Sequence, residues 1–249
     1  MRRAIYAVDV GSTIPSRTGN IAFAWAKLYT DASDQVFADH NIELLASSLR
    51  FDLSNGISVS LGFEAPLFIP VPTTAMNLSK ARCNEGNRSW SAPAGLAVAT
   101  LAIHQVAWLL DNLIDLRRDG LLTTNFGDWP PDHDRQIFFC WEAFVSGAAH
   151  SDDHRFDAAT AVTNFLAHEE DLQHVNVVHA SRPLSLFHTA AIWSGWIDDT
   201  KQINNHLLVL RPPAAYRGAI RQAEPPGHTR SDVKVTGTGP VRGTCGSWE

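Results

Sequence analysis

Four carboxylates are placed along the chain so that they can share one metal-dependent site. They are Asp9, Glu64, Glu142 and Asp157. The first three follow apolar runs over residues 4–8, 57–63 and 137–141, and the fourth lies in an alanine-rich stretch with helical spacing. A carboxylate at the end of a buried strand is costly unless a metal ion, a partner or solvent receives it. Because the strand ends of one open α/β sheet meet at one edge, we expect a single acidic pocket.

The chemistry of such a pocket is hydrolysis assisted by divalent cations. Carboxylate oxygens are the ligands that Mg²⁺ and Mn²⁺ prefer, and two ions about 4 Å apart can activate water and stabilise a leaving oxygen. We expect Asp9 to bridge the two ions, and Glu64 and Asp157 to hold one ion each. Glu142 is expected to be an outer ligand and the fourth catalytic carboxylate.

Three of these acids also have a structural interpretation. Glu64 and Glu142 can be strand-end residues that pair with nearby arginines. Asp157 falls in the first turn of an expected helix, where the helix dipole stabilises a carboxylate by about 0.3–1 kcal/mol without any catalytic role. His154, three residues earlier, can move protons beside the metals or can be a surface residue. The sequence leaves these alternatives open.

Two arginines and two tryptophans are candidates for substrate contacts. Arg82 and Arg88 lie in the loop after the Glu64 strand. A guanidinium group can clamp a phosphate, and it can equally neutralise an acidic pocket. Trp90 and Trp129 lie in polar loops, where an indole can stack on a base or anchor the loop to the core. Arg82 and Arg88 are therefore expected to bind the substrate.

Apolar periodicity predicts the elements that position these residues. The expected strands are residues 3–9, 20–29, 34–38, 57–64 and 136–142. The expected helices are residues 40–53, 94–118 and 155–168, with a final packed element over residues 181–196. The first two strands are expected to form an antiparallel hairpin. The order predicts an α/β fold with a mixed sheet of about five strands flanked by helices, and with a helical insertion after the fourth strand.

Several short motifs, taken in order, carry a family resemblance. They are Ala7-Val8-Asp9-Val10-Gly11, Gly62-Phe63-Glu64-Ala65-Pro66-Leu67, Arg82-Cys83-Asn84-Glu85 with Arg88, Trp141-Glu142-Ala143-Phe144, and His154-Arg155-Phe156-Asp157-Ala158-Ala159-Thr160-Ala161. Over roughly residues 3–170 the chain resembles the domain-of-unknown-function family of predicted RNase-H-like nucleases. The resemblance implies an RNase-H-like fold and a nuclease or phosphodiesterase that uses Mg²⁺ or Mn²⁺. The implied partner is a nucleic acid or a nucleotide.

Two other functions fit part of the sequence. Asp9-Val10-Gly11-Ser12-Thr13 matches the D-x-G-x-T phosphate loop of sugar kinases, actin and chaperone ATPases, which share the RNase-H-like fold. Those proteins carry a second phosphate loop, and the sequence shows none. The other function is a binding or scaffold protein that has kept the fold without the metal, which the lack of a strongly basic groove in residues 1–210 favours.

Composition limits the number of domains and the kinds of partner that the chain can have. The chain has 249 residues, of which 45% are hydrophobic, enough for one large α/β domain, expected over residues 1–220. Residues 221–249 are basic and rich in Gly, Pro, Ser and Thr, so a disordered tail is expected there. The net charge of −6 argues against strong non-specific binding to a phosphate backbone.

The number of cysteines and the hydropathy of the sequence predict the cellular compartment of the protein. Its three cysteines are widely spaced, which argues against a disulfide framework or a zinc site and indicates a reducing compartment. No uninterrupted apolar run approaches the eighteen or so residues that would span a bilayer. A cytoplasmic protein that does not enter the membrane is therefore expected.

Overall fold

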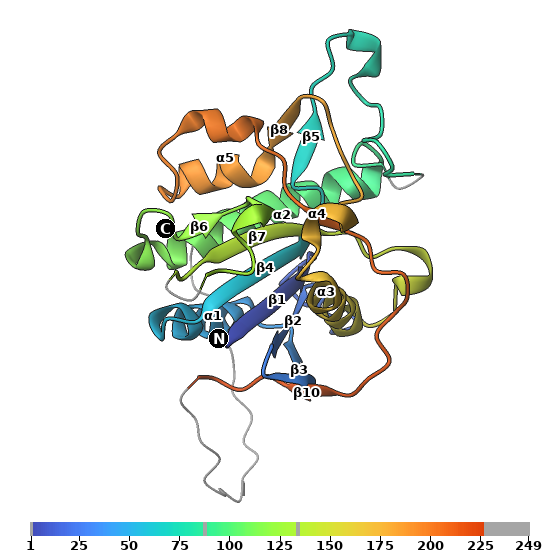
Figure 1. Ribbon diagram of the computed structural model, residues 1–249. Coiled ribbons are helices and arrows are strands. Elements are labelled where there is room, and N and C mark those ends of the chain that lie inside the picture. Colours follow the sequence, from blue (N-terminus) through green and yellow to red (C-terminus); the bar gives the residue numbers. More distant parts are fainter. Residues whose placement is uncertain (1, 87–88, 133–134, 227–249) are drawn as a thin grey trace, which may run out of the picture.

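The computed structural model describes residues 2–86, 89–132 and 135–226. Within these residues an eight-stranded mixed sheet forms the centre of the molecule (Figure 1). Its order is β10-β3-β2-β1-β4-β7-β6, and β9 also pairs with β7. The strands are β1 (Arg3–Asp9), β2 (Ala24–Tyr29), β3 (Ala32–Asp39), β4 (Ser58–Glu64), β6 (Leu122–Thr123), β7 (Phe138–Ala143), β9 (Val209–Leu210) and β10 (Ile220–Gln222).

Strand direction brings the carboxyl ends of three central strands to one edge of the sheet. β1 is antiparallel to β2, and β2 is antiparallel to β3, as expected for consecutive hairpins. β1, β4 and β7 are mutually parallel. α1 lies between β3 and β4 in the chain, and α2 lies between β4 and β7. β1 and β4 both end at an acid, and their register pairs Asp9 with Glu64.

Helices cover both faces of the sheet. The α-helices are α1 (Ile42–Ser54), α2 (Pro93–Asn112), α3 (His154–His168), α4 (Leu172–Val175) and α5 (Leu186–Trp193). The short 3₁₀ helices are Ala75–Asn77, Ile114–Leu116, Phe126–Asp128, Gly147–Ala149 and Thr200–Asn204. α1 and α2 pack on one face and α3 packs on the other (Figure 1). A small second sheet pairs β5 (Phe68–Pro70) with β8 (Pro183–Ser185).

The alternation of side chains along β1 divides the core into two layers. Tyr6 and Val8 belong to the layer under α1 and α2, whereas Ile5 and Ala7 belong to the layer under α3. A strand that is buried on both faces is apolar at nearly every position. The sequence of β1 is accordingly an almost continuous apolar run that ends at Asp9. The core therefore fixes where the first acid of the site lies.

The predicted fold class is confirmed at the level of a mixed α/β sheet flanked by helices. The sheet has eight strands in the described residues, more than the five or so expected. β6, β9 and β10 are short strands of two or three residues, and the pairing of β5 with β8 was also not expected. Such strands are defined by their backbone partners, so periodicity in the sequence does not reveal them.

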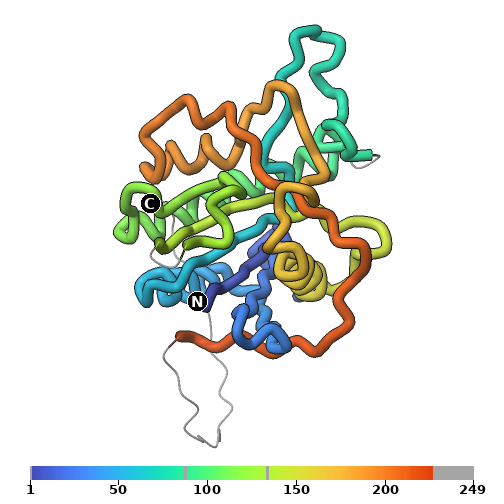
Figure 2. Tube along the Cα trace, viewed as in Figure 1, coloured from blue at the N-terminus to red at the C-terminus, as the bar shows by residue number. Residues whose placement is uncertain are grey.

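The expected boundary of the tail falls inside β10. Ile220, Arg221 and Gln222 pair in parallel with β3, and Ala223 is buried, so disorder from residue 221 onward is wrong for these residues. Figure 2 shows this last described segment returning to lie beside the blue N-terminal strands. Residues 227–249 of the expected tail lie outside the described residues.

One helix is apolar enough to change the expectation about membrane segments. α2 is long and apolar enough to cross a membrane by length and composition, with a mean hydropathy of 1.5 over its best window. Counting uninterrupted apolar residues missed it, because polar residues such as His104 and Gln105 are spaced along it. Ala102, Val106 and Leu109 are buried in the core beside the sheet. A core helix of a soluble protein passes the same test, so α2 is only weak evidence for a membrane span.

Candidate functional site

Three elements bring acids to the carboxyl edge of the sheet. Asp9 ends β1 and Glu64 ends β4, and their backbones are neighbours across the parallel pair, where strands lie about 4.8 Å apart. Asp157 reaches the same place from the first turn of α3, which packs across β1 and β2. Asp9 and Asp157 are buried, and Glu64 is half-buried. The structure therefore brings together three of the four acids expected from the sequence.

The start of α3 is fixed by a local cap. Asp153 accepts a hydrogen bond from the backbone N–H of Arg155 at 2.9 Å, as an N-cap residue does. The helix therefore begins at His154, and residues three apart in a helix share a face. This spacing places both His154 and Asp157 toward the end of β1.

Asp9 and Asp157, the two buried aspartates of the site, each have an imidazole partner. His154 Nδ1 lies 2.6 Å from Asp9 Oδ2, and His150 Nδ1 lies 2.6 Å from Asp157 Oδ2. The backbone N–H of Ser151 donates to Asp157 Oδ1 at 2.7 Å. The site is therefore a mixed cluster of oxygen and nitrogen donors, not the all-carboxylate set expected from the sequence.

Burial makes the charges of this cluster expensive. Burial raises the pKa of Asp9, and the hydrogen bond with His154 opposes that rise. Burial likewise raises the pKa of Asp157, opposed by the N–H of Ser151 and by His150. The hydrogen bond with Asp9 raises the pKa of His154. A bound cation would stabilise both carboxylates in their charged form, as it does at metal sites.

Three donor atoms lie close enough together that they could hold one ion. One donor atom from each of Asp9, His154 and Asp157 lies within 4.8 Å of the others. Ligands at about 2.1 Å from an ion lie about 3.0 Å apart as neighbours and about 4.2 Å apart when opposite. Movements of less than about 1 Å would therefore let these three side chains hold one cation. Glu64 is outside this group of atoms, on the side of Asp9 that faces the cavity.

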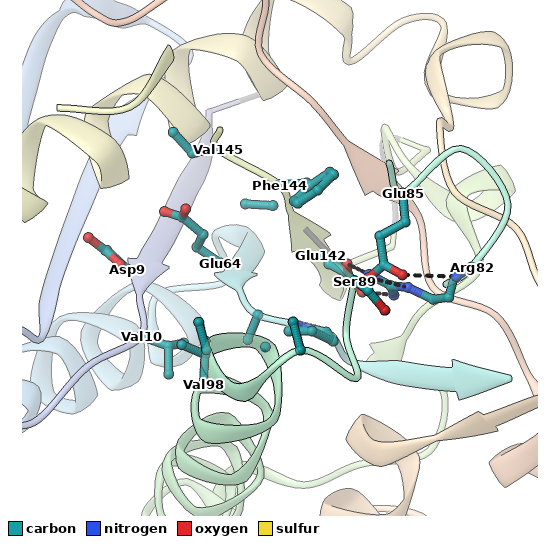
Figure 3. A pocket seen from close by; sticks show the side chains of 16 residues that line it. Asp9, Val10, Glu64, Arg82, Glu85, Ser89, Val98, Glu142, Phe144 and Val145 are labelled. Atoms are coloured by element: carbon teal, nitrogen blue, oxygen red, sulfur yellow. Dashed lines mark hydrogen bonds and ion pairs between the residues drawn. The ribbon is translucent and has the colours of Figure 1, made fainter. Parts of the chain in front are cut away.

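A cavity of about 360 Å³ opens beside the acids. Figure 3 shows Asp9 and Glu64 on one side of it, and Arg82, Glu85 and Glu142 on the other. The cavity lies between the carboxyl ends of β1, β4 and β7 and the first turns of α2. The edge of the sheet thus carries two separate groups of charges with a cavity between them.

The second group is a buried ion network. Arg82 binds both carboxylate oxygens of Glu142, at 2.6 and 2.8 Å, and it also pairs with Glu85 at 3.0 Å. The side chains of all three residues are 1% exposed. The N–H of Leu67 donates to Glu142 at 2.9 Å. Burial raises the pKa of Glu142, and Arg82 opposes that rise.

These contacts support the structural interpretation of Glu142 and Arg82. Glu142 uses both oxygens on the arginine fork and a backbone N–H, so the expected outer ligand is engaged in the wall of the cavity. Arg82 faces two carboxylates, so it neutralises acids and is not presented to a phosphate. Arg88, the other expected substrate-binding arginine, lies outside the described residues.

Other expectations for the site are resolved by packing. Trp129 stacks on Phe139, and the indole N–H of Trp90 donates to the carbonyl of Lys80, so both tryptophans anchor loops. A Cβ on Gly11 would lie 2.4 Å from the backbone of Ala22. That close approach accounts for the glycine of the D-x-G-x-T match without any phosphate.

The sequence reasoning missed His150. The signal available was the run His150-Ser151-Asp152-Asp153-His154, in which two imidazoles precede Asp157 within eight residues. That run does not predict which histidine forms a hydrogen bond with which acid, because Asp9 is 145 residues from His154 in the chain. The pairing is set by the packing of α3 on β1.

Comparison of the chain with protein-family models, with curated proteins and with solved structures finds no match in any of the three.

Proposed function

We propose that the protein is a divalent-metal-dependent hydrolase of phosphodiester bonds, built on an RNase-H-like domain. The observation that carries the proposal is the convergence of Asp9, His154 and Asp157 to within 4.8 Å, with Glu64 beside them. The antiparallel pairing of β1 with β2 and the crossover to the parallel strand β4 agree with the hairpin and crossover expected from the resemblance. Likeness of fold supports the proposal only as an analogy.

Two ions would be held by different residues. Asp9 would serve both, His154 and Asp157 would hold one, and Glu64 would hold the other from the cavity side. Bound Mn²⁺ or Mg²⁺ would polarise the phosphoryl oxygen and lower the pKa of a water molecule. The imidazole of His154 favours Mn²⁺ over Mg²⁺, because nitrogen ligands suit transition-metal ions and Mg²⁺ prefers oxygen.

The test is hydrolysis of nucleic acid by the purified protein with Mn²⁺. We expect nicking of single-stranded or branched substrates, and we expect Asp9→Asn to abolish it by removing a carboxylate shared by both ions. Asp171→Asn is the matched control, because Asp171 also pairs with a histidine, His174, at the exposed start of α4. This control should retain full activity.

Two outcomes would contradict the proposal. If ATP is turned over while nucleic acids are untouched, the phosphate-loop interpretation of residues 9–13 becomes the better one. If neither substrate is turned over and no cation binds, the domain is a binding or scaffold protein.

A further inference from the structure

The cavity beside Asp9 and Glu64 is apolar along most of its wall. Figure 3 shows Val10 and Val98 on one side of it and Phe144 and Val145 on the opposite side. Ala94 and Gly95, in the first turn of α2, also line it and leave it open. The cavity thus offers a site for an apolar group next to the acids.

Charge excludes a phosphate from the interior. Among the described residues that line the cavity, Arg82 is the one arginine or lysine. Glu85 and Glu142 both pair with it, so that three-residue group carries a net negative charge. Glu64 adds a further acid on the other side. A phosphate can therefore be held only at the Asp9 end, where a cation would offset its charge.

Size limits the occupant to one small group. About 360 Å³ lies near the lower limit of sites that enclose small molecules, which run from about 300 to 1,000 Å³. A base pair or a stacked strand does not fit in such a space. One planar base with part of its sugar does.

We propose that this cavity holds a single unpaired nucleobase of the substrate, next to the phosphate that lies at Asp9. The inference rests on the proposed phosphodiester hydrolysis and adds its substrate class: an end, a loop or a flipped nucleotide that can offer a base free of its partner. Contact of one base with apolar and aromatic side chains contributes about ten- to a hundredfold in affinity. Duplex without free ends should be a poor substrate.

A pair of variants on α2 isolates the cavity. Ala94 and Ala97 are both exposed and lie in the first turns of the helix, so Phe at either position leaves the core intact. Ala94 lines the cavity, and Ala97 does not. Ala94→Phe should therefore fill the cavity, while Ala97→Phe is the matched control.

Binding is measured with a six-nucleotide single-stranded DNA that carries 2-aminopurine, whose fluorescence reports burial of the base. A second DNA lacking that base serves as the abasic probe, and its binding is measured by its competition with the fluorescent DNA. Mn²⁺ is added by rapid mixing, so that binding is recorded before hydrolysis. We expect Ala94→Phe to weaken binding of the intact probe at least tenfold and Ala97→Phe to leave it unchanged. The abasic probe should bind weakly, and equally, to the wild type and to Ala94→Phe.

The outcomes separate this inference from the proposed function. The base site alone would be overturned if the protein nicks DNA, Ala94→Phe binds the probe as the wild type does, and the abasic probe binds as the intact probe does. Base binding that is lost in Ala94→Phe, in a protein that does not nick, would support the base site and overturn hydrolysis. Absence of any fluorescence change with the wild type would overturn the inference.

Discussion

Arg82 is predicted to be essential for stability, not for chemistry. Arg82→Met would leave the carboxylates of Glu85 and Glu142 buried without a cation. Breaking a buried ion pair by removing one partner costs about 3–5 kcal/mol, because a buried charge is left uncompensated. For a domain of this size, each kcal/mol lowers Tm by about 2–4 °C, so the expected loss is about 6–20 °C.

The assay is urea unfolding of the metal-free protein, followed by circular dichroism. The matched control is Arg50→Met, because Arg50 pairs with Asp115 on the exposed surface, where a salt bridge contributes about 0–1 kcal/mol. Replacing all three charges together (Arg82→Met, Glu85→Gln and Glu142→Gln) should recover most of the loss. A loss below about 1 kcal/mol for Arg82→Met would refute the reasoning and would favour Glu142 as a metal ligand.

Three further predictions concern a cation, pH and packing. Mn²⁺ at about 100 times its Kd should raise the free energy of unfolding by about 2.7 kcal/mol, and Asp9→Asn should remove that gain in a thermal melt. Burial lowers the pKa of His188 to about 4, below its ordinary value of 6.5. The folded state therefore favours the neutral form of His188. The free energy of unfolding is highest above about pH 6.5 and falls as the pH falls toward 4, because the unfolded state takes up the proton first. Across this pH window, urea unfolding should show that the free energy of unfolding of the wild type changes by about 3 kcal/mol. His188→Gln should remove this change, and an equal dependence on pH in the two proteins would contradict the prediction. Gly62→Ala should lower stability by about 1–3 kcal/mol or more, because its Cβ would lie 2.4 Å from the indole of Trp141, and an unchanged unfolding midpoint would refute this packing argument.

The central strands could be predicted because their signals are local. β1 and β4 are apolar runs that end at an acid, and parallel strands end at a common edge, so the proximity of Asp9 and Glu64 follows from the pattern. The cap at Asp153 likewise made the start of α3 predictable to within one residue. The short strands β6, β9 and β10 could not be found, because their existence depends on backbone partners far along the chain.

The roles of the acids could not be separated from the sequence alone. Glu142 follows an apolar run just as Glu64 does, yet its partner Arg82 is 60 residues away in a loop. His154 meets Asp9 only because α3 packs on β1. Local pattern therefore predicts where acids gather, and long-range packing decides which of them meet a histidine and which meet an arginine.

Calorimetric titration with Mn²⁺ tests the central claim most directly. The account predicts saturable binding to the wild-type protein, at least tenfold weaker binding to Asp9→Asn, Asp157→Asn and His154→Gln, and unchanged binding to Asp171→Asn. Absence of Mn²⁺ binding to the wild type, or binding that all four variants retain, would contradict it.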